Sequence, residues 1–312
     1  AEVYHAVIDY LDGRIWGLLF SFPFLALRSF LVGITRTKAL NMAALTAVLV
    51  NIPSNWLLIF HWNMGIAGAA IASSFAEACS LAVLAIHVLR KMDKQFYGLY
   101  WRFDKTVLRH ICQVSVWSML HSFISVAPWF LFFVAIEHLG ELQLAVANIL
   151  RSISTLFFVI VNSFAATTGS LVSNLIGADE RGQVFPLCSR VIRLGYAIGL
   201  PLIALALVFH QPVASVYTDN PAIVQTAWLP FVVMLLNYVL ALPGYVYMNA
   251  VTGTGATRIA FIFQATTIAA YLLYLWGLSH WDVPLAVYWT VEYLFVIGLG
   301  VQSVIYLKYK HF

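Results

Sequence analysis

Nine long apolar stretches, separated by short polar breaks, constrain this chain more than any other feature. An α-helix needs about 20 largely apolar residues to cross a bilayer, and each stretch is long enough. Most of the breaks carry turn residues, as in His138-Leu139-Gly140. We therefore expect an all-α polytopic membrane protein with nine transmembrane helices. The predicted spans cover residues 15–36, 39–60, 66–89, 109–136, 142–174, 186–209, 222–252, 258–279 and 284–308.

The composition agrees with a membrane protein and excludes a soluble one. Of 312 residues, 62% are hydrophobic and only 10% are charged, whereas a soluble domain carries roughly a quarter charged residues. The three cysteines, Cys79, Cys112 and Cys188, lie far apart within or beside apolar stretches, so they predict neither a disulfide framework nor a CxxC metal site. No basic stripe with interleaved aromatic residues occurs outside the apolar stretches, so the partner is the lipid bilayer and not a nucleic acid.

The basic residues predict the orientation in the membrane. Alternate loops carry 14 of the 17 Lys and Arg residues, and the intervening loops carry none. An excess of Lys and Arg marks cytoplasmic loops, so we expect an integral protein of the bacterial cytoplasmic membrane with a cytoplasmic C-terminus. Of the other three, Arg28 and Arg151 lie within spans, and Arg14 is expected at the outer rim of the first span. The 14 are Arg36, Lys38, Arg90, Lys91, Lys94, Arg102, Lys105, Arg109, Arg181, Arg190, Arg193, Arg258, Lys308 and Lys310.

Two segments of the chain repeat each other. Residues 23–38 and 243–258 align without a gap at an offset of 220 and share a Pro, a Gly, a Thr and a final basic residue. Each copy is followed by one helix and then by a turn that contains His-Trp. Both copies run in the same direction across the membrane, which predicts a parallel internal repeat.

The repeat also predicts how the chain is divided. Three more helices precede the second copy, and nothing precedes the first, which also lacks an initiator Met. We therefore expect a chain that has lost about 110 residues from its beginning. Residues 1–90 are then the remaining three helices of an N-terminal lobe, residues 91–108 a cytoplasmic linker and residues 109–312 a C-terminal lobe of six helices.

Four short stretches are specific through their order and spacing. They are residues 28–35 (RSFLVGIT), 65–72 (GIAGAAIA), 170–179 (SLVSNLIGAD) and 252–257 (TGTGAT). Together they resemble the multidrug and toxic compound extrusion (MATE) family over essentially the whole chain, as helices four to twelve of twelve. The resemblance implies two bundles around a central cavity with alternating access. It also implies export of cationic or amphipathic small molecules in exchange for sodium ions or protons, with no further cofactor.

The resemblance points to a first set of coupling-ion candidates. Some members bind the cation through an acidic residue on the first helix, an Asn-x-x-x-Asp pair and a later Thr. Here Asn51 and Asn55 occupy the pair, with a carboxamide in place of the carboxylate, and Ser73 supplies the hydroxyl. Their oxygens could coordinate sodium, or the three side chains could hydrogen-bond neighbouring helices. Glu77, four residues after Ser73, could replace the missing carboxylate or form a hydrogen bond between lobes.

A second set of candidates comes from the C-terminal lobe. Other members use a Glu on the seventh helix, where Ser125 stands here, and His121 lies one turn before it as a proton carrier or a static hydrogen-bonding group. Arg151 and Glu292 occur at similar depth, and a charge at bilayer depth is costly unless it faces a cavity or a partner. We expect these two to form an ion pair that either lines the cavity and responds to protonation or is purely structural.

Aromatic side chains in the spans could stack on flat cations or serve as packing and interface anchors. The residues concerned are Trp117, Trp129, Phe130, Tyr238 and Trp289.

Other functions are less well supported by the sequence. Neither HExxH nor Gly-x-Ser-x-Gly occurs, so an enzyme is not expected. The closest alternative is a flippase for lipid-linked oligosaccharide or polysaccharide precursors, which would need several basic groups in the cavity. We expect a monomeric transporter.

Overall fold

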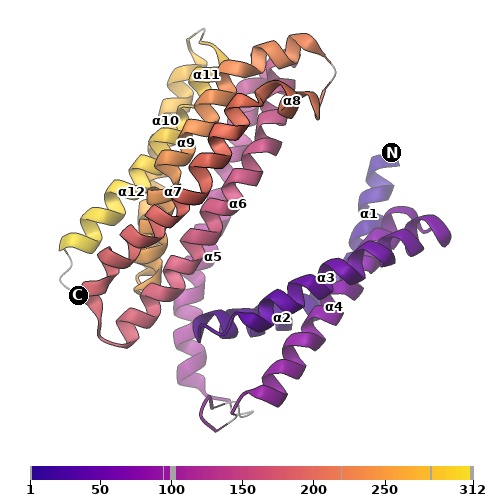
Figure 1. Ribbon diagram of the computed structural model, residues 1–312, viewed down its shortest axis with the longest axis vertical. Helices are drawn as coiled ribbons and strands as arrows, with labels where there is room; N and C mark the ends of the chain where they lie inside the picture. The colour runs from indigo at the N-terminus through magenta and orange to yellow at the C-terminus, as the bar shows by residue number, and fades with distance from the viewer. Residues whose placement is uncertain (1, 94, 99–102, 219, 282, 310–312) are drawn as a thin grey trace. The chain divides into compact units, whose positions relative to one another are not determined.

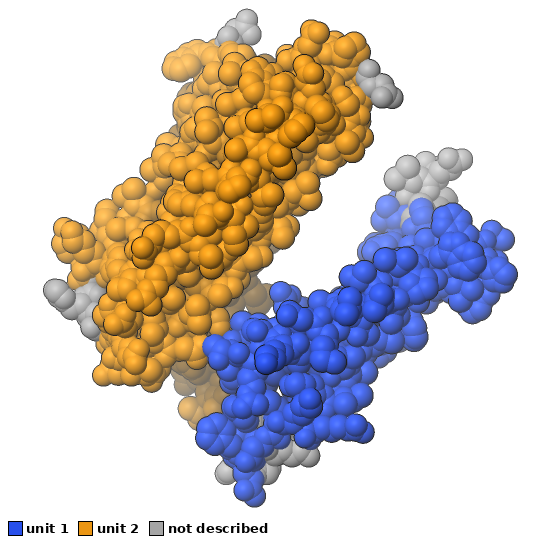
Figure 2. Space-filling model, viewed as in Figure 1, with its two compact units in different colours: residues 1–103 blue, residues 104–312 orange. Residues whose placement is uncertain are grey.

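The computed structural model describes residues 2–93, 95–98, 103–218, 220–281 and 283–309. The chain forms two compact units, Ala1–Phe103 and Asp104–Phe312 (Figure 2). The basic residues Lys94, Arg102 and Lys310, which were used to predict the orientation, lie outside the described residues.

The first unit is built around one long helix. Helices α1, α2 and α3 all pack against α4, and a short π-helix, η1, continues α3. Apolar residues of α2, α3 and α4, among them Leu31, Ala43 and Leu84, form its buried core. The elements are α1 (Glu2–Ile15), α2 (Leu18–Gly33), α3 (Lys38–Asn55), η1 (Trp56–His61) and α4 (Gly65–Lys91).

The second unit is a bundle of long helices in which α9 is central (Figure 1). Helices α6, α7 and α12 pack against α9, and α10 bridges α5 and α12. The elements are α5 (Lys105–Glu137), α6 (Glu141–Gly177), η2 (Arg181–Gln183), α7 (Val184–Val208), α8 (His210–Ser215), α9 (Pro221–Gly253), α10 (Thr257–Ser279), α11 (Leu285–Tyr288) and α12 (Val291–Tyr309).

The all-α membrane class predicted from the sequence is confirmed. The described part of the chain contains helices and no strand, and eight of its helical segments are long and apolar enough to cross a bilayer. Large apolar side chains also stand on the outside, as at Phe123 (80% exposed) and Leu273 (70%). Water would make such exposure unfavourable, whereas lipid tails solvate it. The chain is an integral membrane protein.

The first predicted span, residues 15–36, needs correction. The structure has the 16-residue apolar helix α2 at this place and a further helix, α1, before it, with a break at Trp16 and Gly17. Hydropathy missed α1 because it carries several acidic residues and Arg14. The other eight predicted spans agree with the observed helices to within a few residues, although the last one is divided into α11 and α12.

The segment between the two units is shorter than the predicted linker of residues 91–108. Helix α4 ends at Lys91, and α5 already begins at Lys105. Asp104 caps α5, since its side chain accepts hydrogen bonds from the backbone N–H groups of Thr106 and Val107. The assignment of the two units to lobes of a larger protein, and the parallel repeat, stay predictions.

Candidate functional site

A large cavity of about 730 Å³ lies inside the second unit. Five helices, α5, α6, α9, α10 and α12, supply its walls. The lining is unusually polar for a membrane bundle, because hydroxyl, carboxamide, imidazole and carboxyl groups project from otherwise apolar helices. These polar residues are Ser118, His121, Ser122, Ser125, Asn162, Asn249, Thr252, Thr257, Gln264, Tyr271 and Glu292.

A small cavity of about 240 Å³ adjoins the large one. The two share four lining residues, Trp129, Phe158, Tyr245 and Glu292. Arg151 lines the small cavity, which is otherwise walled mainly by aromatic and aliphatic side chains. Glu292 is therefore the carboxylate that borders both spaces.

Among the described residues, the carboxylate of Glu292 forms a single side-chain hydrogen bond. Its Oε1 accepts a hydrogen bond from the Tyr271 hydroxyl at 3.2 Å. Tyr271 is fully buried, and its hydroxyl also lies 3.5 Å from the carbonyl oxygen of Pro128 in α5. Glu292 itself is only half-buried, because the cavities leave part of the carboxylate accessible. The second carboxylate oxygen is free to meet a cation.

His121 and Ser125, one turn apart on α5, both line the large cavity, as their spacing suggested. Ser125 donates its hydroxyl hydrogen to the carbonyl of Ser122 at 2.7 Å, which leaves the lone pairs of its oxygen for other donors or for a cation. The structure thus brings His121, Ser125 and Glu292 to the wall of one cavity.

The ion pair predicted between Arg151 and Glu292 is not formed. No contact within 4.0 Å joins the two side chains in the part of the chain that is described. The Arg151 guanidinium instead lies 5.0 Å from the ring centroid of Phe133, a cation–π contact. Two residues at similar depth on different helices need not point their side chains at each other. Both residues do line the small cavity.

The aromatic candidates divide between the two roles considered for them. Trp129 lines both cavities, and Tyr238 and Trp289 line the small one. Trp117 instead packs on Phe261 with ring centroids 5.4 Å apart, and Phe130 is an outward-facing, 69% exposed side chain. The first three can contact a molecule in the cavities, and the last two serve packing or lipid contact.

In the first unit, three of the predicted coupling-ion residues form a hydrogen-bonded chain. Asn55 Nδ2 donates to Asn51 Oδ1 at 2.8 Å, and Asn51 Nδ2 donates to Ser73 Oγ at 3.4 Å. Ser73 in turn donates to the backbone carbonyl of Ala69 at 2.9 Å. These hydrogen bonds link the side chains between α3 and α4, whereas Asn55 Oδ1 accepts none of the hydrogen bonds found among the described residues.

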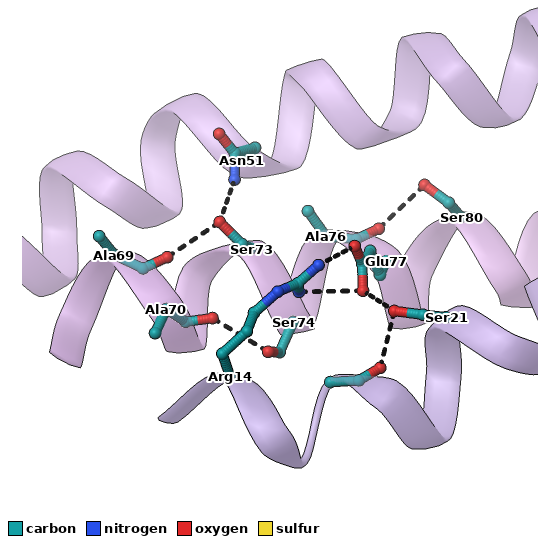
Figure 3. A network of polar contacts seen from close by, with 11 residues as sticks. Arg14, Ser21, Asn51, Ala69, Ala70, Ser73, Ser74, Ala76, Glu77 and Ser80 are labelled. Atoms are coloured by element: carbon teal, nitrogen blue, oxygen red, sulfur yellow. Dashed lines mark hydrogen bonds and ion pairs between the residues drawn. The ribbon is translucent and has the colours of Figure 1, made fainter. Parts of the chain in front are cut away.

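Glu77 points to a different neighbour (Figure 3). Its carboxylate forms a two-pronged ion pair with Arg14 of α1 and also accepts a hydrogen bond from Ser21 of α2. Glu77 stands at the midpoint of α4, twelve residues from Gly65. Arg14 thus meets the middle of a helix that is long enough to cross the membrane, and its expected place at the outer rim of a span stays a prediction.

Sequence reasoning missed several of these residues. Gln264 and Tyr271 are seven positions apart on α10 and thus on one helical face, a signal that could have identified them as cavity residues. Arg14 and Ser21 gave no such signal, because nothing in the sequence shows that the end of α1 meets the middle of α4.

Comparison with known proteins agrees with this architecture. The sequence profile of the MatE family matches residues 118–275, just over half of the chain. The probable multidrug resistance protein NorM of Shewanella oneidensis is 22% identical over 302 residues, covering 94% of this chain and 62% of that protein. The multidrug resistance protein MdtK of Cronobacter sakazakii is 25% identical over 311 residues, covering 94% and 66%.

Solved structures show the same fold. A mutant of the Vibrio cholerae MATE transporter VcmN superposes with a TM-score of 0.85 at 18% identity, covering 99% of this chain and 70% of that one. A MATE in the straight conformation gives a TM-score of 0.82 at 18% identity, covering 98% and 69%. The chain thus spans about two thirds of the length of the curated relatives it matches.

The fold and the cavities define a polytopic helical membrane protein with a polar cavity inside a helix bundle. Together with the profile match, they show that the chain belongs to the MatE family.

Proposed function

We propose that this chain is part of a secondary active transporter that exports cationic or amphipathic small molecules by alternating access, driven by sodium ions or protons. The similarity to proteins named for multidrug resistance supports this proposal. The protein acts as a transporter and not as an enzyme, and it needs no cofactor besides the coupling ion. It is monomeric in the inner membrane of a bacterium, with its C-terminus in the cytoplasm.

The observation that carries the proposal is Glu292. It is the carboxylate of the large cavity, one of its oxygens has no protein partner among the described residues, and aromatic side chains surround it. A carboxylate beside aromatic faces suits an organic cation, because both attract positive charge while the rings contribute apolar contact. His121 and Ser125 extend the polar wall of the large cavity, and Arg151 adds a positive charge to the small cavity that Glu292 also lines.

The first unit supplies a second place for the coupling ion. Asn51, Asn55 and Ser73 offer neutral oxygens that suit sodium better than a proton, since none of them ionises at accessible pH. A drug bound near Glu292 and a cation bound in the first unit would be coupled if each prefers a different conformation of the protein.

A flippase for lipid-linked oligosaccharides is not favoured. Such a substrate carries phosphates, which call for basic groups. None of the residues that line the large cavity is Lys or Arg, and only Arg151 lines the small one.

The proposal is tested by replacing Glu292 in the intact protein reconstituted in liposomes. Glu292→Gln keeps the size and the hydrogen bond from Tyr271 but removes the charge. We expect transport of a fluorescent organic cation, driven by an imposed sodium or proton gradient, to fall by about tenfold or more, equal to about 1.4 kcal/mol. Undiminished, gradient-dependent transport by this variant would refute the role of Glu292.

Glu137→Gln is the matched control. Glu137 is exposed in the last turn of α5 and lines neither cavity. An acidic side chain at a helix C-terminus is not favoured by the helix dipole, so its neutralisation should leave transport unchanged and raise stability only slightly.

A further inference from the structure

The helix formed by α1 and α2 is interrupted beside the middle of α4. Helix α1 ends at Ile15 and α2 begins at Leu18, and both pack along α4. The contact is close at Gly17, where a Cβ atom would lie 2.4 Å from Ser74 Oγ. The two helices are thus the halves of one discontinuous segment, and only glycine lets α4 approach the break so closely.

Charged and polar side chains gather at this break (Figure 3). Arg14, in the last turn of α1, places Nη1 3.0 Å from Glu77 Oε2, and its Nη2 contacts Glu77 Oε1. Ser21, in the first turn of α2, contacts Glu77 Oε2 and lies 3.0 Å from the carbonyl oxygen of Gly17. All of these groups belong to the first unit, and none is part of the cavities of the second.

The signs of the charges match the ends of the two half-helices. The C-terminal end of α1 carries a partial negative charge and the N-terminal end of α2 a partial positive charge. Arg14 lies at the former, and Glu77 faces the latter through Ser21. Transporters commonly bind ions at such interrupted helices, since the exposed helix ends supply complementary partial charges. At this break, a side chain of the protein itself supplies the cation.

The pair is accessible and not sealed in the core. The side chains of Arg14 and Glu77 are 27% and 30% exposed. Glu77 nevertheless lies about 18 Å from the start of a helix that is about 40 Å long, where an unpaired charge is costly. If Arg14 leaves, another cation must therefore take its place.

The other neighbours of Glu77 do not supply such a cation. Among the described residues, Arg14 and Ser21 are the side chains that interact with Glu77, and Tyr10, one turn before Arg14 on α1, interacts electrostatically with Arg14. From α3, the polar side chain that reaches α4 is Asn51, and it contacts Ser73.

We propose that Glu77 and Ser21 form a site for a monovalent cation at the α1–α2 break, and that Arg14 occupies this site as an internal competitor. Sodium or a proton that binds Glu77 displaces the guanidinium and releases the end of α1 from α4. The inference rests on the cation coupling proposed above and adds Arg14 and Ser21 to the residues that control it.

Thermal unfolding of the purified intact protein tests the competition. In a first series, the midpoint temperature of unfolding is measured at increasing concentrations of sodium chloride, and choline chloride keeps the ionic strength constant. In a second series, the same midpoint temperature is measured at different pH values without sodium. Arg14→Gln removes the competitor, so we expect half-maximal stabilisation at a cation concentration about tenfold lower than in the wild type. Glu77→Gln should abolish the response. A shift in the sodium series identifies sodium, and a shift confined to the pH series identifies the proton.

Two further variants keep the proposal falsifiable. Arg14→Lys retains the charge but loses the two-pronged contact, so it should give a smaller shift in the same direction, and it decides the question if Arg14→Gln does not fold. Arg181→Gln breaks the exposed pair with Asp179 and should change nothing. An unchanged concentration dependence in the Arg14 variants, or a full response in Glu77→Gln, overturns the proposal.

These measurements need no transport. An Arg14-dependent shift in a protein that fails to transport any tested cation would refute the proposed function and leave this site standing. Coupled transport by a protein that shows no Arg14-dependent shift would refute this site and leave the proposed function standing.

Discussion

Gly253, at the end of α9, is the residue at which the packing of the second unit is most easily tested. It faces Gly169 of α6 across the most extensive helix pair of the chain. A Cβ atom at position 253 would lie 2.4 Å from the carbonyl oxygen of Gly169 and 3.1 Å from its Cα. Ser173 of α6 also donates a hydrogen bond to the Gly253 carbonyl at 2.7 Å. All the atoms in the way are backbone, so none can rotate aside.

Gly253→Ala should therefore destabilise the protein. The two helices must separate by about 1 Å to restore ordinary contact, and overpacking of this kind costs about 1–3 kcal/mol. The Ser173 hydrogen bond would weaken at the same time, with a cost of about 1 kcal/mol. The better helix propensity of alanine returns at most about 1 kcal/mol, and less at a helix end. We expect a net loss of about 2 kcal/mol.

The assay is reversible unfolding of the intact protein in detergent, with Gly277→Ala as its control. Gly277 lies in α10, and a Cβ atom there would meet nothing within 4 Å. The same substitution should stabilise at that position, by about 0.5–1 kcal/mol, because it only restricts the unfolded chain and favours the helix. The two variants should move the unfolding free energy in opposite directions. Equal effects, or a stabilised Gly253→Ala, would refute the close packing of α6 and α9.

Two further predictions concern single hydrogen bonds. Tyr271→Phe removes the donor to Glu292, so the organic-cation concentration for half-maximal transport should change by about tenfold, whereas Tyr196→Phe, which lines neither cavity and loses a bond to the backbone carbonyl of Val239, should not change it; equal dependence in both variants would contradict this. Asp104→Ala removes the cap of α5 and should cost about 1 kcal/mol of unfolding free energy without altering transport kinetics, and an unchanged unfolding curve would show that the cap does not stabilise the helix.

The fold followed from the sequence where one physical effect dominated. Runs of apolar residues longer than a bilayer is thick leave a chain little choice but to form helices, because lipid offers the backbone no hydrogen bonds. The prediction failed at α1, where the acidic residues and Arg14 lower the hydropathy. Arg14 is tolerated there because it pairs with Glu77 of α4, which is a tertiary contact. The hydropathy of the segment does not reveal its contact with α4.

The structure shows why the glycines of one sequence motif are needed. In the segment TGTGAT, Gly253 provides close approach to α6, whereas Gly255 adopts a positive φ of 83° at the turn into α10. One glycine is needed for space and the other for backbone conformation. The sequence showed both as the same letter, so it marked the turn without distinguishing the two reasons.

The sequence indicated part of the membership of the candidate site but not its contacts. Ionisable residues within spans are expected to face a cavity or a partner, and His121, Arg151 and Glu292 line the cavities, while their roles stay predictions. Which partner each one meets depends on rotation of its helix by a few tens of degrees. Arg151 therefore contacts Phe133 where an ion pair with Glu292 was expected.

The two membrane carboxylates differ in a way that assigns them different tasks. Glu292 is held by one neutral donor, Tyr271, so a cation can approach it with no protein charge to displace. Glu77 has both oxygens engaged by Arg14 and Ser21, so a cation reaches it only by exchange. Binding at Glu292 should then depend on the size and shape of the ligand, because the cavity decides what fits. Binding at Glu77 requires a positive charge, because the guanidinium that leaves has to be replaced. A bulky organic cation is accordingly expected to bind at Glu292, and a sodium ion or a proton at Glu77.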